Sequence, residues 1–121
     1  MFITRLYTGS DQESHFEDID IPLDDRGDIG RLSRLFPATG MMLSETPGNY
    51  DYQWHTAPWR QFVLMLEGSV EIEVGDGTIR RFDPGDILLV EDTTGRGHIT
   101  RAVEGRARRS VFVVLGPAPE I

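Results

Sequence analysis

Short apolar runs, separated by turns rich in glycine and proline, repeat along this chain. Between its 13 Gly and 7 Pro residues lie stretches rich in Val, Ile, Phe, Leu and Thr, the composition typical of β-strands. Residues 70–74 alternate apolar and acidic side chains, so one face of this strand would pack inward while the other meets water. The pattern predicts strands over residues 2–8, 15–23, 41–46, 61–66, 70–74, 78–82, 87–90, 98–103 and 109–115.

The segments between these strands have the composition of turns. Gly75-Asp76-Gly77 suits a tight hairpin loop, because glycine and aspartate tolerate positive φ. Residues 67–69 and 83–86 predict turns for the same reason. Residues 28–36 carry apolar positions at helical spacing ahead of Pro37, and one helical turn or an irregular strand would both fit.

Many short strands joined by turns predict an all-β fold, an antiparallel sandwich or barrel such as a jelly roll. At 121 residues the chain has the length of one domain, and its 39% hydrophobic residues supply a core. We expect a single domain over residues 1–121, with a core barrel at about 38–115, N-terminal strands within 1–37 and a short proline-rich tail at 116–121.

The net charge of the chain limits the classes of partner that it can bind. A formal net charge of −8 has the wrong sign for binding a nucleic-acid backbone or anionic lipid. The longest apolar runs are too short to span a bilayer, and the first residues lack the apolar stretch of a signal peptide. We expect a cytoplasmic protein that binds a small molecule, with no nucleic-acid or membrane partner.

The chain has neither Lys nor Cys, which excludes a lysine Schiff base, a P-loop lysine, a thiol nucleophile and a thiolate metal site. Site chemistry must then come from histidine, carboxylate, tyrosine, hydroxyl, arginine and amide groups. The chain has 3 His. Among them, His15 sits beside Glu17 in an acidic segment, which predicts a charged outer face.

Two segments carry a recognisable pattern. One runs from His55 through Gln61 to Gly68, and the other begins at Asp83-Pro84-Gly85-Asp86, continues as a strand and a loop, and reaches His98. These segments resemble the two motifs of the cupin superfamily, and in particular small single-domain cupins. The resemblance implies a jelly-roll barrel (a double-stranded β-helix) in which residues of both motifs meet at one interior pocket.

The metal-ligand positions of the resembling motif are incompletely kept. Aligned on Gly68, the family's first histidine falls on His55, its second on Ala57 and its glutamate on Gln61, while His98 matches the histidine of the second motif. The chain thus retains His55, His98 and an amide oxygen, which is less than the two histidines and one carboxylate that hold non-haem iron firmly. An acid such as Glu45, Asp51, Glu91 or Asp92 would have to complete the shell, and spacing selects none of them.

We first expect a small cupin enzyme that transfers protons on a small oxygenated metabolite, as in isomerisation, epimerisation or dehydration. An imidazole titrates near neutral pH and can take or give a proton, so the predicted catalytic residues are His55, His98 and Tyr52. The predicted substrate-binding residues are Gln61, Arg60 and Trp54.

Two alternatives belong to other classes. The first is a metal-dependent cupin, an oxygenase or metal-assisted lyase, with a weakly bound Fe, Mn, Ni or Zn ion on His55, Gln61 and His98. The second is a non-catalytic barrel that binds a small molecule or sugar, because Tyr50, Tyr52, Trp54 and Trp59 cluster around His55.

The remaining features predict structure or assembly. Arg106, Arg108 and Arg109 would offset the acidic surface, and Met41-Met42 would pack in the core. We expect a homodimer formed through edge strands, with residues 2–7 contributing.

Overall fold

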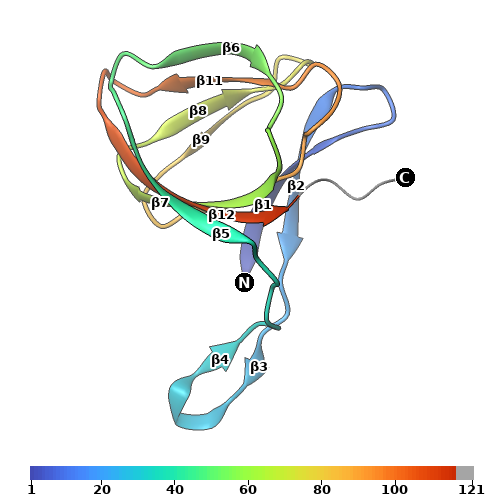
Figure 1. The fold of residues 1–121 in the computed structure, drawn as a ribbon, viewed down its shortest axis with the longest axis vertical. Helices are drawn as coiled ribbons and strands as arrows, with labels where there is room; N and C mark the ends of the chain where they lie inside the picture. The colour runs from blue at the N-terminus through green and yellow to red at the C-terminus, as the bar shows by residue number, and fades with distance from the viewer. Residues whose placement is uncertain (117–121) are drawn as a thin grey trace.

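Two β-sheets curl towards each other and enclose the interior of the molecule (Figure 1). The computed structural model describes residues 1–116, so the proline-rich tail predicted at 116–121 lies outside the described residues except for Gly116. The larger sheet has six strands in the order β2-β1-β10-β7-β12-β5, and the smaller has four in the order β6-β11-β8-β9.

The strands of the larger sheet are β1 (Phe2–Thr8), β2 (Ser14–Asp20), β5 (Gly40–Thr46), β7 (Arg60–Glu67), β10 (Ile87–Val90) and β12 (Arg108–Gly116). Those of the smaller sheet are β6 (Asp51–His55), β8 (Val70–Glu73), β9 (Ile79–Phe82) and β11 (His98–Ala102). Neighbouring strands are antiparallel, except that β1 runs parallel to β10. The predicted all-β jelly-roll architecture is therefore confirmed, with one parallel pair added.

Most predicted strands and turns are present. The hairpin predicted at residues 75–77 joins β8 to β9, where the amide of Val74 donates to the carbonyl of Thr78 at 3.0 Å. In β8, Val70 and Ile72 are buried and the acidic residue that follows each of them is not, as the alternating pattern predicts. The predicted strand at 15–23 ends earlier, at Asp20.

A small arm leaves the barrel between β2 and β5. It consists of β3 (Asp24–Asp25), a 3₁₀ turn at Gly27–Ile29 and β4 (Arg31–Leu32), and it projects away from both sheets (Figure 1). The segment predicted as one helical turn or an irregular strand therefore contains parts of both. None of the residues in these three elements is buried. The helical spacing of apolar residues in this segment therefore does not correspond to a helix packed against the core.

The core lies between the sheets and draws on both. Its fully buried residues include Leu6 of β1, Leu88 of β10 and Val74, which directly follows β8. The prediction that Met41 and Met42 pack in the core is wrong, because they are 61% and 44% exposed on β5, an edge strand. In residues 1–116, no helix has the length and apolar character needed to cross a membrane.

Candidate functional site

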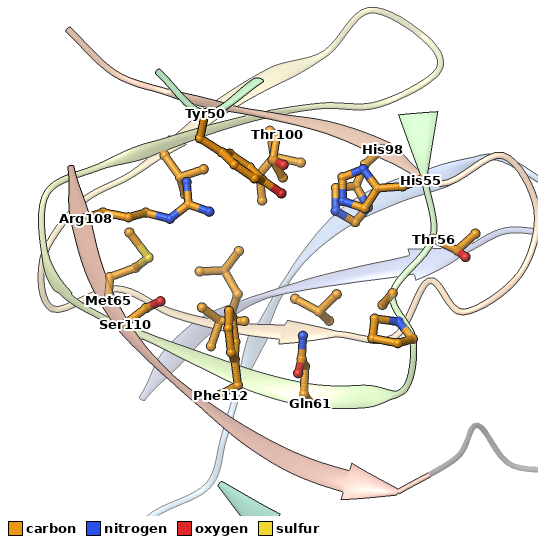
Figure 2. A pocket seen from close by; sticks show the side chains of 17 residues that line it. Tyr50, His55, Thr56, Gln61, Met65, His98, Thr100, Arg108, Ser110 and Phe112 are labelled. Carbon is orange, nitrogen blue, oxygen red and sulfur yellow. The ribbon is translucent and has the colours of Figure 1, made fainter. Parts of the chain in front are cut away.

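A cavity of about 140 Å³ opens between the two sheets (Figure 2). By comparison with an engineered cavity of about 150 Å³ that binds benzene, a molecule of roughly six heavy atoms fits this volume. Apolar side chains from both sheets line part of the wall: Val63, Met65, Val70, Ile72, Leu88, Val90 and Phe112. Polar side chains line the rest: Tyr50, His55, Gln61, His98, Thr100, Arg108 and Ser110.

The structure brings His55 and His98 together at one end of this cavity (Figure 2). His55 is the last residue of β6 and His98 the first of β11, and the two are direct register partners. Their ring centroids are 4.4 Å apart. Gly97 permits this approach, because its φ is +80° and a Cβ there would overlap the carbonyl oxygen of His55.

Each imidazole is fixed through its Nδ1 atom. His55 Nδ1 lies 2.7 Å from the carbonyl oxygen of Gln53, and since a carbonyl only accepts, Nδ1 carries the proton and Nε2 carries the lone pair in the neutral ring. Burial lowers the pKa of His55 below the ordinary value of 6.5, and the neighbouring His98 lowers it further. Near neutral pH, His55 is therefore a neutral base.

His98 has a different partner, a buried carboxylate. Its Nδ1 lies 2.5 Å from Asp92 Oδ2, and the Ser14 hydroxyl donates to the same oxygen at 2.7 Å. The carboxylate fixes the ring and its tautomer, and it can balance the positive charge when Nε2 takes up a proton. Asp92 is one of the four acids that could have completed a metal shell. In the structure its carboxylate instead contacts His98 and orients that ring.

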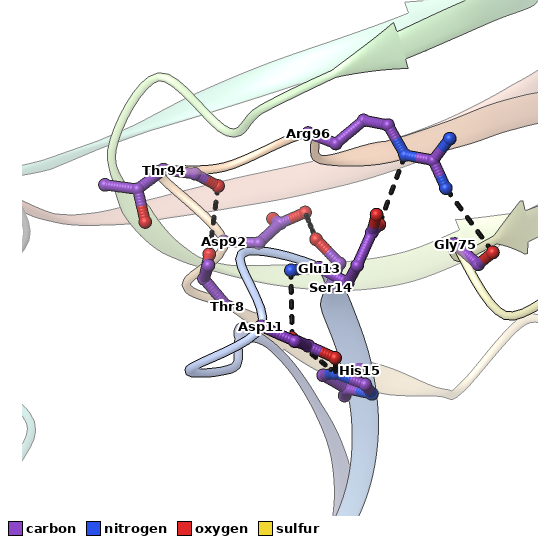
Figure 3. Close-up of polar contacts among 9 residues, drawn as sticks. All are labelled: Thr8, Asp11, Glu13, Ser14, His15, Gly75, Asp92, Thr94 and Arg96. Atoms are coloured by element: carbon purple, nitrogen blue, oxygen red, sulfur yellow. Dashed lines mark hydrogen bonds and ion pairs between the residues drawn. The ribbon is translucent and has the colours of Figure 1, made fainter.

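The loop that carries Asp92 and His98 is braced by the turn between β1 and β2 (Figure 3). Thr8 donates to the carbonyl of Thr94 at 3.0 Å, and Arg96 pairs with Glu13 at 3.1 Å while also reaching the carbonyl of Gly75. These contacts connect residues 91–97 to two other segments of the chain. They hold in place the loop that positions Asp92 and His98.

Gln61 presents its amide in a defined orientation. The indole N–H of Trp59 donates to Gln61 Oε1 at 3.0 Å, and because an indole only donates, the oxygen must face Trp59. The Nε2 group then faces the cavity (Figure 2). Gln61 thus offers the cavity a hydrogen-bond donor rather than an oxygen ligand.

This donor set does not fit the expected metal centre. His55 and His98 can each offer Nε2, but the Gln61 oxygen is turned towards the Trp59 indole, and Glu45, Asp51 and Glu91 do not line the cavity formed by residues 1–116. Within the described chain, no group of at least three His, Cys, Asp or Glu residues could hold a metal ion. The metal-dependent alternative therefore lacks a geometric basis.

Arg108 is a cavity residue that the sequence pattern did not reveal. It was expected to offset the acidic surface, but its guanidinium points into the cavity (Figure 2). Burial lowers the pKa of the Arg108 guanidinium below its ordinary value, although an arginine remains charged at neutral pH. Its neighbour Arg109 is exposed and lies 3.8 Å from Glu67, as the surface prediction requires.

Other predicted site residues lie outside the cavity. Tyr52 packs edge-on against the ring of His55, with centroids 4.1 Å apart, and is 51% exposed. Trp54 lies beneath the guanidinium of Arg96. Arg60 pairs with Glu91 at 2.6 Å, so the structure does not bring Trp54 or Arg60 to the cavity wall.

His15 is also remote from the cavity. It lies on the outside of β2, and its Nε2 is 2.8 Å from Asp11. The charged outer position agrees with the prediction, although its partner is Asp11 rather than Glu17.

One solved structure supports the fold. A conserved protein of unknown function from Streptococcus pyogenes superposes with a TM-score of 0.51 at 22% identity, over 75% of this chain and 72% of that one. A putative ethanolamine utilization protein Q from Salmonella typhimurium matches with a TM-score of 0.46 at 14% identity, over 98% of each chain. None of the curated proteins matches this chain.

The sequence itself matches a family model described as the EutQ-like cupin domain, over residues 32–110. This match spans more than half of the chain and includes both segments that resemble cupin motifs. The predicted cupin membership is therefore confirmed, and the chain belongs to the family of EutQ-like cupin domains.

Proposed function

We propose that this protein is a small cupin enzyme that transfers protons on a small oxygenated metabolite bound in the cavity. The observation that carries the proposal is the pair of histidines, His55 and His98, on one cavity wall with different Nδ1 partners. A carbonyl holds one ring and a carboxylate holds the other. Two titratable groups in unlike environments are the usual basis for separate base and acid roles.

The proposed step begins with His55. Its neutral Nε2 takes a proton from a carbon beside a carbonyl, and the C–H electron pair moves to the carbonyl oxygen to give an enolate-like intermediate. Protonated His98 then gives its Nε2 proton to a carbon, completing an isomerisation or epimerisation. Given to a leaving hydroxyl instead, the same proton completes a dehydration that releases water.

Donors near the histidines would stabilise the intermediate. The Gln61 amide and the Tyr50 hydroxyl both face the cavity (Figure 2), and preorganised donors of this kind stabilise a developing oxyanion. Tyr52, which packs against His55, is better suited to holding that ring than to contacting substrate. Asp92 is a positioning residue for His98.

Solvent exchange tests the proposal even while the product is unidentified. Small carbonyl and hydroxy compounds are incubated with the protein in D₂O, and loss of C–H signals is followed by NMR. We expect the wild type to incorporate deuterium into at least one compound, and His55→Ala to lose at least ~100-fold in rate.

The matched control is His15→Ala, which removes an imidazole outside the cavity and should exchange at the wild-type rate. Equal exchange by His55→Ala and wild type would contradict the proposal. A compound that binds in the cavity and shows no exchange would favour the non-catalytic binding barrel.

A further inference from the structure

Arg108 brings an unbalanced positive charge to the cavity. Most arginines of residues 1–116 lie within salt-bridge distance of an acid, among them Arg5, Arg60 and Arg109. In the same part of the chain no acid pairs with Arg108, whose guanidinium lies 5.2 Å from the ring centroid of Tyr50. A half-buried guanidinium without a carboxylate is costly unless an anion joins it.

Unpartnered polar atoms belong to three side chains of the cavity wall, one of them Arg108 itself. Within residues 1–116, the buried side-chain atoms without a hydrogen-bond partner include Arg108 Nη1, Ser110 Oγ and Thr100 Oγ1, and all three residues line the cavity. Ser110 is 2% and Thr100 8% exposed. An unsatisfied buried donor costs stability, so this cluster is built for an acceptor that the protein itself does not provide.

The strands explain why these groups meet. Arg108 and Ser110 are two residues apart on β12 and point to one face, while Thr100 belongs to β11 of the opposite sheet. Figure 2 shows Arg108 at the end of the cavity away from His55 and His98. A ligand that reaches both ends would thus be anionic at one end and reactive at the other.

We infer that Arg108, Ser110 and Thr100 bind the carboxylate of the substrate, so that the enzyme acts on a small carboxylic acid. The inference rests on the proposed function, whose substrate class it names. A guanidinium fork matches a carboxylate with two parallel hydrogen bonds, and the two hydroxyls supply further donors. The small volume leaves room for a short carbon chain that extends to the histidines.

Binding measurements with paired probes test the inference. Lactate and pyruvate are compared by titration calorimetry or ligand NMR with their amides, lactamide and pyruvamide, which have the same size and no charge. We expect at least one acid to bind at least ~10-fold more tightly than its amide. Arg108→Gln should weaken that acid by roughly 10- to 100-fold, and Arg109→Gln, which changes an exposed neighbour, should not.

Three results would overturn the inference: neither acid binds, acid and amide bind equally, or Arg108→Gln binds the acid as the wild type does. Inorganic phosphate is the second anionic probe, and tighter Arg108-dependent binding of phosphate would replace the carboxylate assignment. Circular dichroism confirms that each variant is folded.

The two proposals fail separately. Acid binding that depends on Arg108, without deuterium exchange on any compound, refutes proton transfer and leaves the carboxylate site intact. Exchange on an uncharged compound that is unaffected by Arg108→Gln refutes the carboxylate site and leaves proton transfer intact. His55→Ala should bind the acid with near wild-type affinity while losing exchange.

Discussion

At the scale of single residues, the site depends on where protons and charges lie. His55 is partly buried beside another imidazole and donates its Nδ1–H to a backbone carbonyl. Protonating Nε2 would place a charge in a desolvated position, so the neutral ring is favoured. The neutral ring keeps its lone pair on Nε2, and His55 lines the cavity, where a base is needed.

This arrangement predicts the titration of His55. Its pKa should lie below 6.5, as measured by NMR of ¹⁵N- or ¹³C-labelled histidine. The unfolded chain then binds the proton more readily, so His55 should lower the free energy of unfolding as pH falls from about 6.5 through its folded pKa. A His55 pKa at or above 6.5 would contradict the assignment of this ring as the neutral base.

Arg108 should cost stability when no anion is bound. We expect Arg108→Met to raise the free energy of unfolding by about 1 kcal/mol, because it removes an unsatisfied donor and a desolvated charge. Urea denaturation of the free protein measures this, with Arg109→Met as the control at an exposed position. A loss of stability in Arg108→Met would show that the charge has a partner in the free protein.

The residues of the site differ in how readily a sequence reveals them. His55, Gln61 and His98 stand at motif positions, and the structure brings all three to one cavity. Arg108 lies between Arg106 and Arg109, and nothing in the local sequence distinguishes the three. Only the alternation of side chains along β12 points Arg108 inward and Arg109 outward. Asp92 is adjacent to another acid, and its role depends on a contact with Ser14 from a distant strand.

At the scale of secondary structure, the pairing of β6 with β11 creates the histidine pair. Their register sets His55 opposite His98, and it shifts immediately after this point, between His98 and Thr100. β6 itself was not predicted: Tyr52 and Trp54 alternate with polar residues, but residues 51–54 are exposed, so this segment has no buried apolar side. This segment is a strand because its backbone pairs with β11, and the local sequence alone does not reveal that pairing.

Gly97 is the test of this pairing. Gly97→Ala should destabilise the fold by at least about 2 kcal/mol, because it adds a clash with the His55 carbonyl to the cost of positive φ. Gly77→Ala has a similar φ of +88° with open space around it, and should cost about 1 kcal/mol. Equal losses in thermal or urea unfolding would show that β6 and β11 are not in close contact at this point.

At the scale of the whole molecule, apolar residues remain uncovered on the arm and the adjacent sheet edge. Leu35, Leu43 and Met41 are among the most exposed large hydrophobic residues. Residues 2–7, which were expected to join a dimer through an edge, lie in β1, which is paired on both sides, so the free edges of the larger sheet are β2 and β5. If the expected homodimer forms through a strand edge, β5 with its exposed apolar residues is the better candidate than β1.

Light scattering tests this assembly. We expect a particle of twice the chain mass, and Leu43→Glu should return it to the monomer by placing charge on the β5 edge. Thr78→Glu, on the remote hairpin between β8 and β9, is the control and should stay dimeric. A monomeric wild type would refute the predicted dimer without affecting the site inside the barrel.

The most direct measurement is a crystal structure of the protein soaked with the small acid that binds best. We expect the carboxylate to lie against Arg108 and the adjacent carbon to be directed at the Nε2 atoms of His55 and His98, within roughly 3–4 Å of one of them. An acid bound away from Arg108, or one whose carbon chain points away from both imidazoles, would contradict this prediction.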